Sequence, residues 1–384
     1  MNWIKKKNKK VGKMILLSIL LGVTALTFGI IMFVSCAPTF GGNPNQVRLD
    51  RMKQSNNFKN GKFYNAIETP MQLQEGSFFK TTKEFLFGGE NRVPDLTVPF
   101  ITIDSLELNY RSTDEVKVTW LGHSSVLISF EGYIFLTDPM FGKRASPVSF
   151  MGPKRFNDTL PLSLKHISKI DAIIISHDHF DHLDYKTIKK LHSKTVKFFV
   201  PLGVGAHLEE WGIHPNKIVE LDWWEESQFQ TDIKLVATPA RHFSGRGLND
   251  RNGTLWTSWV IKSEKHSIYF GGDSGYSPLF KEIGEKYGPF DLTMLECGAY
   301  NKAWPYIHMM PEETAEAHLD LQGKVLLPIH WAQFNLSLHP WFEPIERLLK
   351  TAKTENITVG TPKIGESFII NGILPQNDWW RSHN

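Results

Sequence analysis

The chain has 384 residues, which is enough for one large domain or two small ones. Its net charge of +3 is close to balance, and no basic stripe or added module indicates nucleic-acid binding. The two cysteines, Cys36 and Cys297, are too few for a disulfide framework or a cysteine-rich zinc site. Any bound metal must therefore be held by histidines and carboxylates.

The N-terminus has the composition of a membrane anchor. Lysines between Lys5 and Lys13 precede an uncharged apolar run, residues 14–35, that is long enough to span a bilayer. The run ends at Cys36 after a small residue, as in a bacterial lipobox, although Phe33 stands where Leu is usual. Two alternatives stay open: a lipoprotein attached through Cys36, or a single-pass anchor. Both place the following residues on the extracytoplasmic face of a bacterial membrane.

The chain is predicted to have three parts. Residues 1–36 form the signal or membrane anchor. Residues 37–111 read as an irregular linker, with Gly, Pro and Asn at 41–45, followed by an aromatic-rich extension that packs on the core. Residues 112–384 form the catalytic domain.

Short apolar strands alternate with helical patterns from Val116 onward. Strands are predicted at 116–120, 126–130, 133–137, 171–175, 197–200, 233–237, 258–261, 267–270, 291–295 and 325–329. Helices are predicted at 184–192, 311–321 and 343–352. The turn at Gly132 predicts a hairpin. Consecutive strands followed by helices, twice over, indicate an α/β fold of two sheets with helices outside.

Four candidate metal ligands stand directly after the apolar strand at 171–175: His177, His179, Asp181 and His182. His177 and His179 alternate, so both can face one way in an extended segment. Asp181 and His182 follow a turn and can face a second metal. Imidazole and carboxylate suit zinc, so the segment predicts a metal centre rather than a histidine-rich surface loop.

Three more ligand-type residues follow the ends of predicted strands. His242 comes after 233–237, Asp273 after 267–270, and His330 directly after 325–329. Any one of them alone is more typical of a hydrogen-bonded structural residue. Together with the His-x-His-x-Asp-His segment, they predict a shared metal site at the strand ends.

This ligand pattern resembles that of the metallo-β-lactamase superfamily. Further blocks resemble the N-acyl-phosphatidylethanolamine-hydrolysing phospholipase D family more closely, over roughly residues 112–370. They lie at 119–123, 136–139, 144–147, 151–156, 220–226, 288–292 and 328–331.

The resemblance implies an αββα sandwich with two zinc ions at its edge. By matched position, one zinc is held by His177, His179 and His242, the other by Asp181, His182 and His330, and Asp273 bridges them. His308 matches an active-site histidine near the substrate phosphate, so Asp181, Asp273 and His308 are the expected catalytic residues. His123 and Asp184 are expected to orient ligands, with a structural role and a helix cap as their alternatives.

Two departures from the family pattern lie near the pocket. Ile307 stands where a polar Gln is expected, and Glu296-Cys297 replaces the Pro-Ile of the animal enzymes. Both departures bear on the identity of the substrate.

The resemblance implies that hydroxide formed between the zinc ions attacks a phosphodiester, releasing N-acylethanolamine and phosphatidic acid. The expected partners are a phospholipid and the membrane, and family analogy suggests a homodimer. Two alternatives were weighed against this function. One is a hydrolase of another phosphodiester or a lactone on the same site, and the other is a zinc-binding surface lipoprotein without turnover.

Overall fold

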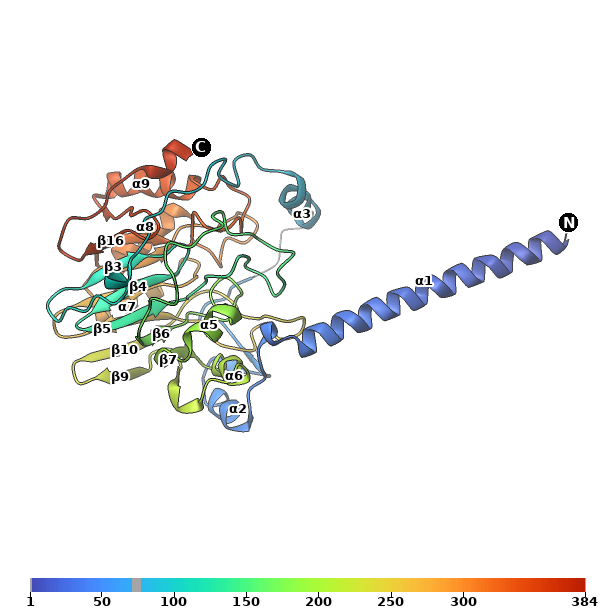
Figure 1. The fold of residues 1–384 in the computed structure, drawn as a ribbon, viewed down its shortest axis with the longest axis horizontal. Helices are drawn as coiled ribbons and strands as arrows, with labels where there is room; N and C mark the ends of the chain where they lie inside the picture. The colour runs from blue at the N-terminus through green and yellow to red at the C-terminus, as the bar shows by residue number, and fades with distance from the viewer. Residues whose placement is uncertain (1, 71–76, 384) are drawn as a thin grey trace.

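The computed structural model describes residues 2–70 and 77–383 and contains two seven-stranded sheets packed face to face. Helices cover the outer face of each sheet, and one long helix leaves the domain at the N-terminus (Figure 1). The αββα sandwich implied by the sequence is confirmed.

The first sheet has the order β16-β3-β4-β5-β6-β7-β8. Its strands are β3 (Lys117–Trp120), β4 (Val126–Phe130), β5 (Tyr133–Thr137), β6 (Ile170–Ile174), β7 (Thr195–Pro201), β8 (Ile218–Leu221) and β16 (Ser367–Ile369). Strands β4 and β5 form the predicted hairpin, in which Glu131 and Gly132 both have positive φ. That conformation matches the twist of a tight hairpin. From β5 to β8 the strands run parallel.

The second sheet has the order β15-β14-β13-β12-β11-β10-β9. Its strands are β9 (Glu226–Gln230), β10 (Ile233–Thr238), β11 (Ser258–Lys262), β12 (Ser267–Phe270), β13 (Phe290–Glu296), β14 (Gly323–Ile329) and β15 (Thr358–Val359). Strands β12 to β15 are parallel, and β10 runs in the same direction as β12 because both are antiparallel to β11. The carboxyl ends of β10, β12, β13 and β14 therefore meet at one edge.

The outer layers are short amphipathic helices. Helices α5 (Tyr185–Leu191) and α6 (Gly205–Glu210) pack on the first sheet through Ile188, Leu191 and Leu208. Helices α7 (Leu279–Tyr287), α8 (Pro311–Asp320) and α9 (Glu343–Glu355) cover the second sheet. Short 3-10 helices also occur at η2 (Pro215–Lys217) and η3 (Trp379–His383), and a third, η1 (Pro38–Phe40), follows the N-terminal helix.

The core between the sheets is apolar and aromatic. Phe130 and Phe135 of the first sheet belong to the same buried cluster as Trp259 and Val260 of the second. Trp259 is fully buried, and its indole N–H donates to the carbonyl of Ile175, 2.9 Å away, just before the metal-ligand segment. This tryptophan therefore joins the sheet interface to the start of the candidate site.

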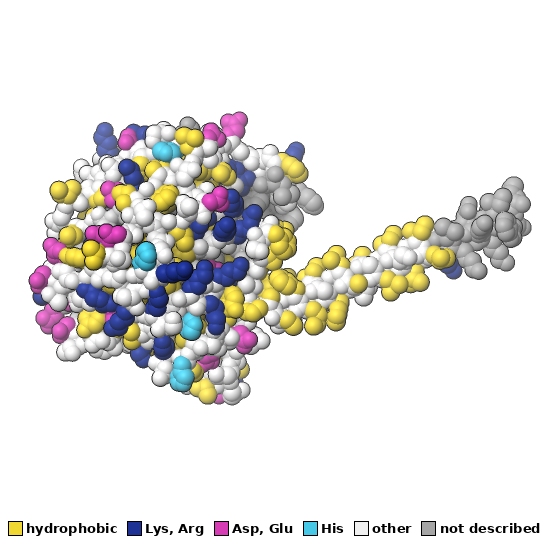
Figure 2. Space-filling view, in the orientation of Figure 1, with side chains coloured by type: hydrophobic (Ala, Val, Ile, Leu, Met, Phe, Trp, Pro, Cys, Tyr) yellow, Lys and Arg dark blue, Asp and Glu magenta, His cyan; other side chains and the backbone are white. Residues whose placement is uncertain are grey.

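Helix α1 (Asn2–Cys36) projects from the domain as a single rod with apolar side chains along it (Figures 1 and 2). Among the described residues, Gly12–Cys36 is the segment long and apolar enough to cross a membrane, with a mean hydropathy of 2.5. No part of that apolar stretch is buried against the domain core. Cys36 is exposed at its end.

The prediction that the linker region after Cys36 is irregular is wrong in part. It contains α2 (Gln46–Met52), a small hairpin of β1 (Phe58–Lys59) and β2 (Lys62–Phe63), and helices α3 (Ser77–Phe87) and α4 (Ser105–Leu108). Asn45 caps α2 by accepting from the amide of Arg48. Met52 and Phe63 are buried with Trp223 and Trp256 of the main domain. The side chains of Phe78, Phe79 and Phe85 lie outside the described part.

Replacing Trp259 by alanine is expected to lower the free energy of unfolding by about 3–5 kcal/mol, because it opens a cavity between the sheets. It also leaves the Ile175 carbonyl without its indole partner. Urea denaturation followed by circular dichroism measures the change. The matched control is Phe150→Ala, at a side chain 78% exposed, for which about 0.5 kcal/mol or less is expected. Equal losses in the two variants would contradict this account of the core.

Candidate metal centre

Side chains with ligand chemistry gather where strands of both sheets end. The segment 176–182 follows β6, Asp273 follows β12 through two glycines, and His330 directly follows β14. His242 comes shortly after β10. All four strands end at the same edge of the sandwich, so residues far apart in the chain meet there.

The first group of ligand atoms consists of three imidazoles. His177 Nε2 lies 2.8 Å from His179 Nδ1, and His242 Nε2 lies 3.3 Å from the same Nδ1 atom. The three nitrogens converge on one point and can hold one metal ion. These are the residues that the resemblance assigns to one zinc.

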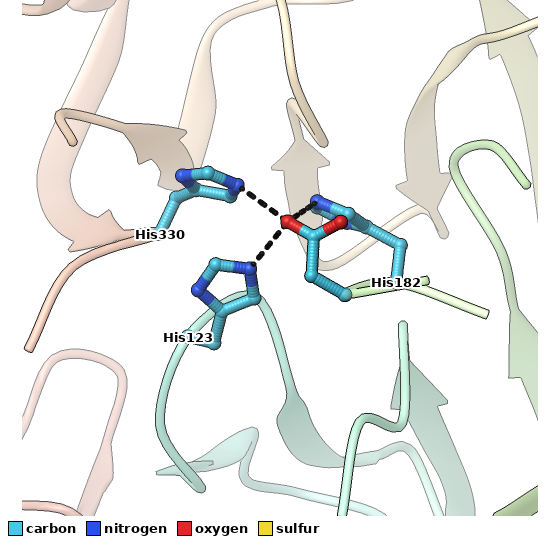
Figure 3. A group of neighbouring side chains, drawn as sticks. His123, His182 and His330 are labelled. Atoms are coloured by element: carbon cyan, nitrogen blue, oxygen red, sulfur yellow. Dashed lines mark hydrogen bonds and ion pairs between the residues drawn. The ribbon is translucent and has the colours of Figure 1, made fainter. Parts of the chain in front are cut away.

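The second group surrounds the carboxylate of Asp181. Its Oδ2 atom lies 3.4 Å from Nε2 of His182 and 3.4 Å from Nε2 of His330. His123 Nε2 approaches the same oxygen at 3.1 Å. Figure 3 shows His123, His182 and His330 directing their ring nitrogens at one carboxylate oxygen from three different segments.

Asp273 lies between the two groups. Its Oδ2 atom is 3.1 Å from Nε2 of both His182 and His330, and 3.8–3.9 Å from Nε2 of His242 and His177. One carboxylate oxygen thus faces imidazoles from both groups, which is the geometry that a bridging ligand requires.

The donor set fits a pair of cations. Several buried atoms of the cluster make no well-directed hydrogen bond: Asp273 Oδ1, both ring nitrogens of His330, and His182 Nε2, although carboxylate oxygens lie near the two Nε2 atoms. Unpaired buried polar atoms are costly, and bound cations would satisfy the nitrogen and oxygen lone pairs together.

Hydrogen bonds fix the ring orientation of several ligands. His182 Nδ1 donates to Asp138 Oδ2 at 2.7 Å, and His242 Nδ1 donates to the carbonyl of Ile307 at 2.8 Å. His177 Nδ1 lies 2.9 Å from Ser176 Oγ. In each case Nε2 is left with its lone pair facing the cluster, as in carboxylate–histidine–metal arrangements. At Ile307 the backbone carbonyl orients His242, so this contact does not depend on the Ile307 side chain.

Asp138 is a site residue that the sequence reasoning did not assign. It is fully buried, and besides His182 it accepts from the amide and hydroxyl of Ser176. Asp138 directly follows strand β5. The position of a ligand-type residue just after a strand, which indicated the other candidate ligands, could therefore have indicated Asp138 as well.

Charge balance also favours bound cations. Burial lowers the pKa of His177 and His242 well below the ordinary value, so both imidazoles are neutral. Burial opposes protonation of His330 too, but the carboxylate of Asp273 raises its pKa to about 10. The carboxylates therefore require positive charge beside them, which metal ions can supply.

The two residues expected to orient ligands differ in their contacts. His123 touches the ligand Asp181, as expected of a residue behind the ligands. Asp184 caps α5 by accepting from the amide and hydroxyl of Thr187, which is the alternative role weighed for it. His123 and His330 have φ of 52° and 64°, a conformation that non-glycine residues rarely adopt. Such strain is typical of functional sites.

His308 lies beside the cluster on the loop before α8. Its ring centre is 5.1 Å from that of His242 and 5.4 Å from that of His330. Its Nδ1 atom contacts Glu296 Oε2 at 2.6 Å. Burial lowers the pKa of His308 to about 4, and burial followed by the charge of Asp273 raises that of the Glu296 carboxyl.

Buried polar groups from other parts of the chain form hydrogen bonds with the segment of candidate ligands. Asp178 accepts from the amide of Gly245 at 2.8 Å and the hydroxyl of Thr254 at 2.9 Å. The guanidinium of Arg246 donates to the carbonyl of Asp178, which lies between two candidate ligands, and to that of Leu183, directly after the last of them. These contacts hold the segment in the shape that presents its ligands.

The neighbouring cations Lys154 and Arg155 are engaged within the protein. Arg155 donates to the carbonyls of Asn157 and Phe141, and Lys154 pairs with Asp158. Cys297 is buried and lies 3.8 Å from the carbonyl of Ile329, consistent with a small core residue.

Comparison with known proteins agrees with this fold. A family model described as a beta-lactamase superfamily domain matches residues 133–331. An uncharacterized protein of Mycobacterium tuberculosis is 42% identical over 334 residues, covering 86% of this chain and 88% of that protein. N-acyl-phosphatidylethanolamine-hydrolyzing phospholipase D 1 of Caenorhabditis elegans is 37% identical over 273 residues, covering 67% and 75%.

A solved structure shares the fold. The metallo hydrolase Igni18 of Ignicoccus hospitalis matches with a TM-score of 0.50 at 21% identity, over 66% of this chain and 98% of that protein. The chain belongs to the metallo-β-lactamase superfamily. Within that superfamily its relatives include N-acyl-phosphatidylethanolamine-hydrolysing phospholipases D, and this membership supports a metal-dependent hydrolase.

Replacing Asp138 by asparagine is expected to weaken metal binding by about 10–100-fold, because the amide cannot balance the charge of the His182–metal pair. Competition with a chelator, followed by elemental analysis of the protein, measures the affinity. Asp232→Asn, at an exposed aspartate, is the matched control and should bind metal as the wild type does. Unchanged affinity in Asp138→Asn would show that this carboxylate does not support the centre.

Proposed function

We propose that this chain is a zinc-dependent phosphodiesterase of the phospholipase D type. It hydrolyses N-acyl-phosphatidylethanolamine-type lipids to an N-acylethanolamine and phosphatidic acid. The observation that carries this proposal is the pair of ligand groups sharing Asp273 Oδ2, with His308 beside them. The similarity to the phospholipase of Caenorhabditis elegans supports the choice of substrate.

Zinc suits the donor set, which consists of imidazoles and carboxylates without thiolates. His177, His179 and His242 would hold one ion, Asp181, His182 and His330 the other, and Asp273 both. When bound, two such ions would supply Lewis acidity toward a phosphoryl oxygen and a water ionised at neutral pH.

The residues of the chain then have distinct roles in the reaction. Asp181 and Asp273 fix the two halves of the site to each other and balance its charge. Water adds oxygen to phosphorus, and the bond from phosphorus to the headgroup oxygen breaks. His308 is placed to donate a hydrogen bond to the phosphate or a proton from Nε2 to the departing oxygen, which then leaves as the alcohol.

A lipid substrate agrees with the anchor. We propose that residues 1–36 hold the protein to the extracytoplasmic face of a bacterial membrane, through α1 itself or through a lipidated Cys36. Residues 37–111 then connect and pack on the catalytic domain of residues 112–384. A cavity of about 560 Å³ between the end of α1 and the metal-ligand segment supports this arrangement, with Ile31, Val34 and Asp178 in its wall.

Product analysis with the full chain in detergent tests the proposal. The zinc-loaded protein is incubated with N-acyl-phosphatidylethanolamine in ¹⁸O-labelled water, and the products are identified by mass spectrometry. Phosphatidic acid carrying one ¹⁸O atom and unlabelled N-acylethanolamine are expected, because attack occurs at phosphorus. Asp273→Asn should reduce the rate by at least about 10²-fold, because it weakens the link between the two metal sites.

Two results would contradict the assignment. Absence of turnover by a protein that binds two zinc ions would reject the lipid substrate and leave another phosphodiester or a lactone for the same site. Label in the N-acylethanolamine would place the cleavage on the carbon side and reject attack at phosphorus.

A further inference from the structure

Glu296 places a buried carboxyl group beside the candidate centre. It is the last residue of β13, and its side chain is fully shielded from solvent. One of its oxygens falls within 4.8 Å of ligand-type atoms on Asp273, His308 and His330. A carboxyl group in such a position needs a specific role, because burying it without partners is costly.

Both carboxyl oxygens of Glu296 are engaged by other parts of the chain. Oε1 accepts from the amides of Ser274 at 2.9 Å and Met309 at 3.3 Å. Oε2 contacts His308 Nδ1 at 2.6 Å. The Glu296 carbonyl is held as well, by the hydroxyl of Thr314 at 2.7 Å. The group is therefore fixed by the loop after β12 and by the start of α8, and it is not a free metal ligand.

The ring of His308 is correspondingly constrained. Because Nδ1 is engaged by Glu296, Nε2 is the ring nitrogen left to act on a substrate. The ring stands next to His242 and His330, one from each ligand group, and its side chain is 12% exposed. Contact with a substrate phosphate therefore has to be made through Nε2.

We propose that Glu296 is a positioning residue that holds His308 by donating its carboxyl hydrogen from Oε2 to Nδ1, so that the N–H at Nε2 faces the candidate metal centre. As Nε2 gives its proton to the departing headgroup oxygen, Nδ1 takes the carboxyl proton, and the proton released by the attacking water restores the carboxyl group. This inference rests on the proposed phosphodiesterase function.

A double-mutant cycle tests the proposal with the full chain in detergent. The variants are Glu296→Ala, Glu296→Gln, His308→Ala and the Glu296→Ala/His308→Ala double variant. Cys297→Ala, at the adjacent buried residue, is the matched control. The substrates are N-acyl-phosphatidylethanolamine, whose alkoxide leaving group needs a proton, and bis(p-nitrophenyl) phosphate, whose leaving group does not. Zinc content and the ¹⁵N shifts of the His308 ring are measured in parallel.

We expect Glu296→Ala to lower kcat for the lipid by about 10²-fold, the range for loss of an acid–base group, with little change in KM. For the p-nitrophenyl ester, kcat should stay within about threefold of the wild type, since proton donation contributes little there. The double variant should be no slower than His308→Ala, because Glu296 acts through His308. Glu296→Gln should keep the zinc content but lose lipid kcat about as Glu296→Ala does, since its amide can donate a hydrogen bond to Nδ1 but has no proton to pass on. Zinc content and the control should match the wild type.

Several outcomes would overturn the proposal. A loss of zinc in Glu296→Gln would make Glu296 a metal ligand, and multiplicative losses in the double variant would mean that it acts independently of His308. If Glu296→Ala does not fold, the same cycle is run with Glu296→Gln. Losses of kcat that multiply in the Glu296→Gln/His308→Ala double variant reject the proposal. If the wild type does not hydrolyse the lipid, the proposed function fails. The ¹⁵N shifts then decide alone, and His308 shifts that are unchanged in Glu296→Ala reject the positioning role.

Discussion

Asp273 Oδ2 approaches imidazoles from both ligand groups, and this contact depends on how closely the two sheets meet at their edge. The residue before it, Gly272, has φ of +57°, and a Cβ atom there would lie 2.4 Å from the Cβ atom of Ser176. Only glycine allows this approach. The amide of Ser176 in turn donates a hydrogen bond to Asp138, and the carboxylate of Asp138 orients His182. A side chain at position 272 would separate the sheets and pull the shared carboxylate away from half of its partners.

The parts of the fold that follow from local pattern could be predicted from the sequence. The buried strands read as continuous apolar runs, and the ligands follow their ends, so the layered architecture and the gathering of ligand types were accessible. Strand β9 was missed because Glu226–Gln230 contains one large apolar side chain and lies at a sheet edge. Helix α6 was missed because it is a short helix whose N-cap residue, Val204, makes no side-chain bond.

Within the site, what could not be predicted depends on long-range contacts. The pairing of Asp138 with His182 joins residues 44 positions apart. The left-handed backbone of His330 is imposed by its surroundings, since histidine adopts this conformation too rarely for its residue type to predict it. The bond between Glu296 and His308 requires β13 and the loop before α8 to meet. The sequence therefore indicated which residues carry the chemistry, and the packing determined which of them touch.

Helix α1 and the segment of candidate metal ligands are joined by a short series of contacts. Phe33 near the end of α1 packs edge-on against Phe40, at 5.6 Å, and Phe40 packs edge-on against Phe180 within the ligand segment, at 6.0 Å. Arg246, which holds the ligand segment, also donates to the carbonyl of Thr39. With α1 in a bilayer, these contacts keep the metal centre at a set height and orientation above the lipid headgroups. Under the proposed function, enzyme and lipid would then meet by lateral diffusion in two dimensions. Turnover would follow the mole fraction of substrate in the membrane, and adding inert lipid would slow it even where the bulk concentration of substrate stays the same.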